Sequence, residues 1–150
     1  MPNASLRVPH DADVDEQIRH IIADLPKINA KLENAPPADI IRWSIDNLPH
    51  LYQTTAFGVT GCVTLDIISR ISAERSEKNH TELRHLVPLI FVDTLYHFPQ
   101  TLDLAERASK HYHAPMYVYK PKGSDTVADF ERTWGSQLGQ RDADTYDYRG

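Results

Sequence analysis

A run of threonines and glycines near the middle of the chain offers the groups that hold a phosphate or a sulfate. The hydroxyls and open backbone amides come from Thr54, Thr55, Thr60, Gly58 and Gly61. Apolar residues follow at helical spacing from Val63, so the positive end of a helix dipole would point at this loop. The pattern by itself supports an anion site and a simple strand-to-helix turn about equally.

A second polar loop begins where a continuous apolar run, residues 86–92 (LVPLIFV), ends at Asp93 and Thr94. Such a run is typical of a strand covered on both faces of a parallel sheet. Ligands of parallel α/β sheets bind beyond the carboxyl ends of the strands, so both loops are expected at one edge. Lys120 and Lys122 follow a third strand and could meet a phosphate there, but we favour a solvated loop for them.

Several familiar catalytic motifs are absent from the sequence. No lysine follows Gly61, which excludes a phosphate-binding loop of the Walker type, and there is no Gly-x-Gly-x-x-Gly fingerprint. His111 and His113 lack a third ligand at a suitable spacing, so no metal site is predicted. His97 could touch a ligand or pack under Pro99, and the spacing does not decide between them.

The single cysteine, Cys62, lies in the first turn of the predicted helix, where the helix dipole would lower the pKa of a thiol. Free cysteine is among the most buried residue types. We therefore favour a small packing residue over a nucleophile at this position.

Apolar spacing predicts the elements that position these loops. Helices are expected over residues 14–32, kinked or interrupted at Pro26, and over 39–47. Strands at 51–57, 86–92 and 116–119 then alternate with helices that start near Val63, Gln100 and Val127, the last stopping near Gly139. Trp43, Phe130 and Trp134 are interpreted as core residues. The order predicts an α/β fold with a doubly wound, mostly parallel sheet.

Length, charge and cysteine content narrow the class of protein. The chain has 150 residues and a formal net charge of −5, which disfavours a dedicated binder of nucleic acid or of anionic membranes. One cysteine excludes an internal disulfide framework. The first thirty residues carry acidic side chains and no unbroken apolar run, so no secretory signal or membrane span is expected. A cytoplasmic protein is predicted.

Two segments together resemble the phosphoadenylyl-sulfate reductases, the thioredoxin-dependent enzymes of sulfate assimilation. They are residues 48–61 (LPHLYQTTAFGVTG) and 89–101 (LIFVDTLYHFPQT), and the likeness continues through 118–121, Asp129-Phe130 and 146–148. The resemblance implies a Rossmann-like nucleotide-binding fold related to the ATP pyrophosphatases (adenine-nucleotide alpha-hydrolase-like). Residues 1–12 are expected to be a polar tail from their composition, and the resemblance makes 13–150 a partial reductase domain, with a helical lead-in at 13–48 and an α/β core at 50–148.

The resemblance further implies a substrate, a partner and a set of binding residues. The substrate would be 3′-phosphoadenylyl sulfate, reduced to sulfite and adenosine 3′,5′-bisphosphate with thioredoxin as reductant and no cofactor. The implied binding residues are Thr54, Thr55, Phe57, Gly58, Thr60, Gly61, Asp93 and Thr94. Ala56 stands where many members have a serine. The resemblance is compatible with a homodimer.

The family nucleophile is the cysteine of a Glu-Cys-Gly-x-His motif, which these 150 residues do not contain. The expectation is therefore a truncated reductase without a catalytic residue, inactive by itself. The alternative is a non-catalytic module that binds adenine nucleotides or sulfonucleotides. A pyrophosphatase-like adenylating enzyme is disfavoured because the Ser-Gly-Gly-x-Asp-Ser loop is missing.

Overall fold

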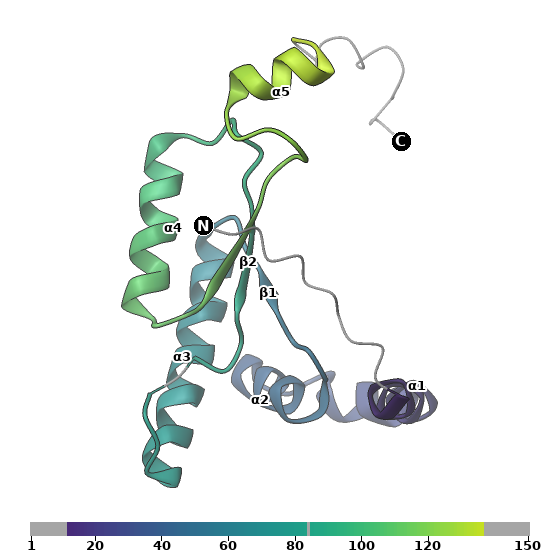
Figure 1. Ribbon diagram of the computed structural model, residues 1–150. Coiled ribbons are helices and arrows are strands. Elements are labelled where there is room, and N and C mark those ends of the chain that lie inside the picture. The colour runs from purple at the N-terminus through teal and green to yellow at the C-terminus, as the bar shows by residue number, and fades with distance from the viewer. Residues whose placement is uncertain (1–11, 84, 137–150) are drawn as a thin grey trace.

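The computed structural model describes residues 12–83 and 85–136 (Figure 1). Its elements in chain order are α1 (Ala12–Leu32), α2 (Pro37–Asn47), β1 (Gln53–Thr54), α3 (Val59–Asn79), β2 (Leu89–Val92), α4 (Pro99–His111), β3 (Met116–Tyr119) and α5 (Val127–Trp134). Most of the predicted tail at 1–12 and the whole 146–148 segment lie outside the described residues.

The three strands form one parallel sheet in the order β1-β2-β3. The helices α3 and α4 connect the strands and lie against the same face of the sheet (Figure 1). Two crossovers of the same hand between consecutive strands place both helices on one side. The predicted α/β class with a parallel sheet is confirmed, and the described residues provide one helical layer of it.

The hydrophobic core lies between the sheet and these two helices. Leu89 and Phe91 of β2 point into it, and Leu65 of α3 and the small residues Ala105 and Ala108 of α4 pack on them. The alanines let α4 approach the sheet closely. Packing in the core therefore positions the first turns of α3 and α4. The two polar loops lie directly before these turns.

The opposite face of the sheet is uncovered among the described residues. In a parallel pair, partners in register share a face, so Ile90 and Val92 of β2 lie with Tyr117 and Tyr119 of β3 on this side. The Val92 side chain is 57% exposed. The prediction that the apolar run at 86–92 is covered on both faces is wrong at Val92, because both crossover helices use the other face.

The two N-terminal helices lie beside the sheet domain, and α1 projects away from it (Figure 1). Pro26 lies inside α1, which continues through it, so the predicted interruption is not seen. Two ion pairs hold α2 against α3: Arg42 with Glu74 at 2.9 Å, and Arg75 with Asp46 at 2.6 Å. Exposed pairs of this kind each contribute about 1 kcal/mol or less. No helix in the described ranges is long and apolar enough to cross a membrane.

Two other sequence predictions are corrected by local backbone geometry. The strand predicted at 51–57 is limited to Gln53–Thr54, and the left-handed φ of 58° at Phe57 is incompatible with a strand that continues to that residue. The last helix ends at Trp134, well before Gly139, because Gly135 adopts a φ of 92°. Trp134 is 56% exposed and is therefore not a core residue.

His85, just before β2, makes stability depend on pH. Its ring is buried and its Nδ1–H donates to the Val87 carbonyl at 2.8 Å. Burial lowers the pKa of His85 below its ordinary value, and the backbone hydrogen bond opposes this only partly. The neutral ring is thus favoured in the folded state, so its stabilising effect is complete above a pH of about 6.5 and is lost as pH falls below it.

Lowering the pH from 7.5 to 5 should lower the melting temperature of the unmodified chain. We expect this decrease to be smaller in His85→Gln. Thermal unfolding followed by circular dichroism at both pH values measures this. His111→Gln, which removes an exposed imidazole, is the control and should keep the original pH dependence. An equal fall in all three proteins would contradict the role of His85.

Candidate functional site

The carboxyl ends of the three strands meet at one edge of the sheet. The Thr55 N–H donates to the Ile90 carbonyl at 3.0 Å, and the Asp93 N–H donates to the Tyr119 carbonyl at 2.8 Å. These bonds join the first residue after β1 to β2, and the first residue after β2 to β3. The structure therefore places the Thr/Gly loop and the Asp93-Thr94 loop at the same edge.

The Thr/Gly loop is held in shape from inside. The Thr55 hydroxyl accepts a hydrogen bond from the Phe57 N–H at 2.9 Å, and the Phe57 ring is buried edge-on against Phe91, with ring centroids 5.6 Å apart. These two predicted binding residues thus use their side chains to shape the loop. Thr54 and Thr60 are exposed and leave their hydroxyls at the surface.

The first turn of α3 opens onto this loop with no side chain capping it. Gly58 is the N-cap residue, and the first hydrogen bond inside the helix runs from the Cys62 N–H to the Gly58 carbonyl at 3.0 Å. The N–H groups of Val59, Thr60 and Gly61 precede that bond, so the helix itself does not satisfy them. At α5, by contrast, Thr126 and Asp129 form a complete capping box. The start of α3 can therefore bind an anion through backbone amides.

Gly61 is required by a close approach inside the loop. A Cβ at this position would lie 2.7 Å from the Thr55 Oγ1, and the Gly61 carbonyl accepts a hydrogen bond from the Gln53 Nε2 at 2.8 Å. No atom lies within 4 Å of the corresponding position at Gly58. The two glycines therefore differ in what a methyl group would disturb.

We expect Gly61→Ala to destabilise the fold by about 1–3 kcal/mol, as overpacking typically does. Gly58→Ala should change the free energy of unfolding by less than about 0.5 kcal/mol, as surface substitutions typically do. Urea unfolding of both variants measures the difference. Equal stability of the two variants would show that the Thr55 hydroxyl moves aside at no cost.

Asp93 is a buried acidic residue at the carboxyl edge of the sheet. Its Oδ1 accepts a hydrogen bond from the Leu95 N–H at 2.8 Å, and its Oδ2 lies 3.8 Å from the Lys120 Nζ. Thr94 beside it is exposed. Lys120 lies in an exposed loop, as the sequence analysis favoured, and its ammonium lies beside Asp93. Its position directly after a predicted strand placed Lys120 at this edge in the sequence analysis, but its pairing with Asp93 was not predicted.

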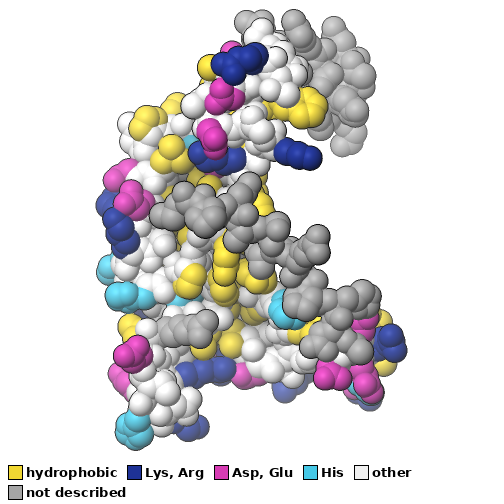
Figure 2. All heavy atoms as spheres, viewed as in Figure 1, with side chains coloured by type: hydrophobic (Ala, Val, Ile, Leu, Met, Phe, Trp, Pro, Cys, Tyr) yellow, Lys and Arg dark blue, Asp and Glu magenta, His cyan; other side chains and the backbone are white. Residues whose placement is uncertain are grey.

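The loop after Asp93 contacts α5. The Tyr96 hydroxyl donates to the Glu131 carboxylate at 3.3 Å, and its ring meets Phe130 edge-on at 6.1 Å. His97 stacks on Phe91 with ring centroids 5.0 Å apart, which favours the packing role. Helix α5 stands above the carboxyl edge, and Figure 2 shows the surface hollowed below it.

Cys62 behaves as a packing residue. Its side chain is half-buried against the core, and its Sγ donates to the Phe57 carbonyl at 3.5 Å. In the described part of the chain no three histidine, cysteine or acidic side chains gather as metal ligands would. In the described ranges the carboxyl edge therefore presents open backbone amides at the start of α3, whereas Cys62 packs on the core.

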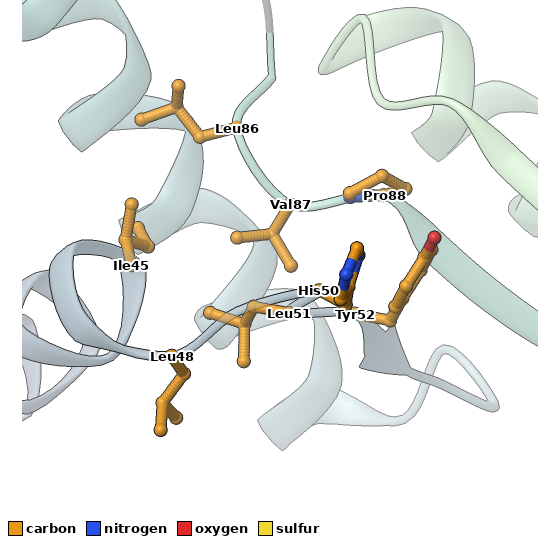
Figure 3. Close-up of a pocket in the computed structure, with 8 residues that line it drawn as sticks. All are labelled: Ile45, Leu48, His50, Leu51, Tyr52, Leu86, Val87 and Pro88. Atoms are coloured by element: carbon orange, nitrogen blue, oxygen red, sulfur yellow. The ribbon is translucent and has the colours of Figure 1, made fainter. Parts of the chain in front are cut away.

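A cavity of about 290 Å³ lies at the other end of the sheet (Figure 3). Its walls come from the end of α2, the segment before β1 and the segment before β2, and they are mostly aliphatic. The lining residues are Ile45, Leu48, His50, Leu51, Tyr52, Leu86, Val87 and Pro88. None of the predicted binding residues is among them.

Residues 50–148 match the model of the phosphoadenosine phosphosulfate reductase domain. The chain is 42% identical over 137 residues to the phosphoadenosine phosphosulfate reductase of Saccharomyces cerevisiae, covering 89% of this chain and 47% of that protein. It is 39% identical over 138 residues to the enzyme of that name from Emericella nidulans, covering 89% and 42%. The chain thus spans about half the length of these relatives.

A solved structure is similar over the same part of the chain. The phosphate complex of the phosphoadenylyl-sulfate reductase from Candida auris superposes with a TM-score of 0.63 at 38% sequence identity. The match covers 89% of this chain and 56% of that one. The fold described above is therefore similar to that of a structurally characterised protein.

Proposed function

Because the chain belongs to the phosphoadenosine phosphosulfate reductase family, we propose that its carboxyl edge binds 3′-phosphoadenylyl sulfate for reduction to sulfite. The observation that carries this proposal is the uncapped start of α3, with exposed Thr60 in its first turn and Asp93-Thr94 directly after the neighbouring strand β2. The amides would hold the 5′-phosphosulfate, and the Asp93 loop would lie near the nucleoside.

In the proposed reaction a cysteine thiolate attacks the sulfate sulfur. The new S–S bond gives an S-sulfocysteine, and the S–O bond to the nucleotide breaks, so adenosine 3′,5′-bisphosphate leaves with that oxygen. A thioredoxin thiol then attacks the cysteine sulfur and releases sulfite, and the second thioredoxin thiol resolves the mixed disulfide. The edge described here would bind and orient the nucleotide and stabilise the charge of the leaving group.

Cys62 is not proposed as the nucleophile. Its thiol donates to the Phe57 carbonyl and packs on the core. We therefore propose that the polypeptide of these 150 residues binds the nucleotide but does not by itself turn it over.

Calorimetric titration with adenosine 3′,5′-bisphosphate tests the binding part of this proposal. Saturable binding of one nucleotide per folded chain is expected, and absence of binding to a cooperatively folded chain would contradict it. Gly61→Ala should weaken the binding, because it disturbs the loop that presents the amides.

Sulfite release from radiolabelled 3′-phosphoadenylyl sulfate, with thioredoxin and its reductase present, tests the catalytic part. The 150-residue polypeptide is expected to release none above the background without protein. Release that disappears in Cys62→Ser would overturn the assignment of Cys62 as a packing residue.

Reduction by thioredoxin needs a reducing compartment, so we also propose a cytoplasmic location. The homodimer stays a prediction.

A further inference from the structure

The sheet order separates two parts of the carboxyl edge. The start of α3 follows β1, whereas Lys120 follows β3, and β2 lies between them. Neighbouring strands lie about 4.8 Å apart, so the two positions are roughly 10 Å apart along the edge. A ligand with one anionic group at α3 and its sugar above β2 would direct a second anionic group toward β3.

Lys120 has the charge and the freedom to meet that second group. Its Nζ lies 3.8 Å from the Asp93 Oδ2 and 3.5 Å from the Asp125 carbonyl oxygen. Both distances exceed the roughly 2.7–2.9 Å of a charged N–H···O hydrogen bond. The pair of Lys27 and Asp24, by comparison, closes to 2.9 Å. The Lys120 side chain is also 38% exposed, so an added anion can reach its ammonium.

Asp93 holds this ammonium at the edge. Its carboxylate is buried and is itself fixed by the Leu95 N–H, so it attracts Lys120 toward the end of β2 without a short bond. Lys122 is exposed two residues later, and Arg132 is paired with Asp129 at 3.2 Å. Of the cationic side chains in the described ranges, Lys120 is the one directly after a strand at this edge.

We propose that Lys120 binds the 3′-phosphate of the nucleotide and sets the preference for 3′-phosphorylated over 3′-unphosphorylated adenosine nucleotides. This rests on the proposed function and identifies the group that selects the substrate. The distinction matters within the matched relatives. Some are named phosphoadenosine phosphosulfate reductases, and others, from Shouchella clausii and Deinococcus radiodurans, are named adenosine 5′-phosphosulfate reductases.

The test compares two nucleotides that differ only in the 3′-phosphate. Adenosine 3′,5′-bisphosphate and adenosine 5′-phosphate are titrated calorimetrically into the unmodified chain, Lys120→Gln, Lys120→Arg and Lys110→Gln. Lys110 is in the last turn of α4, at the opposite edge, so its substitution removes the same charge away from the site. A charge-assisted hydrogen bond predicts about a tenfold or greater loss of bisphosphate affinity in Lys120→Gln.

Affinity for adenosine 5′-phosphate should change by less than about threefold in Lys120→Gln, a difference well below one charge-assisted bond. Lys120→Arg should retain most of the preference, and Lys110→Gln all of it. An unchanged preference in Lys120→Gln, or an equal loss for both nucleotides, would overturn the assignment while leaving the proposed function intact. Absence of binding of either nucleotide to the folded, unmodified chain would overturn both.

Removal of Lys120 leaves the buried Asp93 carboxylate without its cation, and Lys120→Gln could fail to fold. Circular dichroism checks this for each variant. If it does fail, the comparison is made between Asp93→Asn and the double variant Asp93→Asn with Lys120→Gln, in which no buried charge is left unpaired. The same tenfold or greater loss, limited to the bisphosphate, is then expected between these two proteins.

Discussion

Phe57→Ala should lower the free energy of unfolding by about 3–5 kcal/mol, the usual cost of deleting a buried aromatic ring. The ring is buried between the Thr/Gly loop and the core, edge-on to Phe91. Its loss leaves a cavity beneath the loop that presents the α3 amides. Chemical denaturation measures the stability, and titration with adenosine 3′,5′-bisphosphate should show weakened binding in the fraction that remains folded.

Phe57→Gly separates the two roles of this residue. The backbone of Phe57 has a φ of 58°, in the left-handed region that glycine adopts without a steric penalty. Alanine in that region costs about 1–2 kcal/mol more than glycine. We therefore expect Phe57→Gly to be more stable than Phe57→Ala by about 1 kcal/mol. The reverse order would show that the left-handed backbone is not kept when the ring is removed.

Leu65→Ala should cost about 2–5 kcal/mol, because Leu65 is 1% exposed and lies where α3 meets the sheet. The substitution keeps helix propensity high, so the loss reports packing and not helix formation. A lower midpoint of urea unfolding with an unchanged m-value is the expected signature.

Leu102→Ala is the matched control for that experiment. Leu102 is also in a helix, α4, but it is 42% exposed. The same truncation there should cost less than about 1 kcal/mol, because much less apolar surface is removed from contact. Similar losses in the two variants would mean that the interface of α3 with the sheet is not the core of this domain.

Local sequence pattern predicted the helices and strands well in segments that have one clear hydrophobic pattern. The continuous apolar run ending at Asp93 predicted β2, and Pro99 predicted the start of α4. Alternation of strands and helices predicted the parallel sheet, because parallel strands need crossovers long enough to hold a helix. Placing two polar loops at one edge followed from the same rule, and the structure brings both loops there.

Pattern failed where a contact or a backbone angle overrides it. Trp134 has the spacing of a core residue, yet α5 stands above the carboxyl edge and leaves it exposed. Phe57 has the side chain of a strand residue, yet it lies beyond the end of β1 with a left-handed φ, and its ring is buried in the core. Neither outcome follows from periodicity, since both depend on which distant surface is available for packing.

The sequence by itself determined the family, the alternation of elements and the positions of Thr54, Thr60, Asp93 and Thr94 at or beyond the carboxyl ends of their strands. These follow from local spacing and from motifs that are continuous along the chain. Only the tertiary structure decided which of the site residues have side chains that hold the loop in shape and which have side chains that stay exposed. In it the Thr55 hydroxyl accepts a hydrogen bond from the Phe57 N–H, and the Phe57 ring packs on Phe91, so both side chains hold the loop in shape. It also placed Lys120 beside Asp93, because that pairing depends on the register of β2 against β3 and no pattern within one segment encodes it.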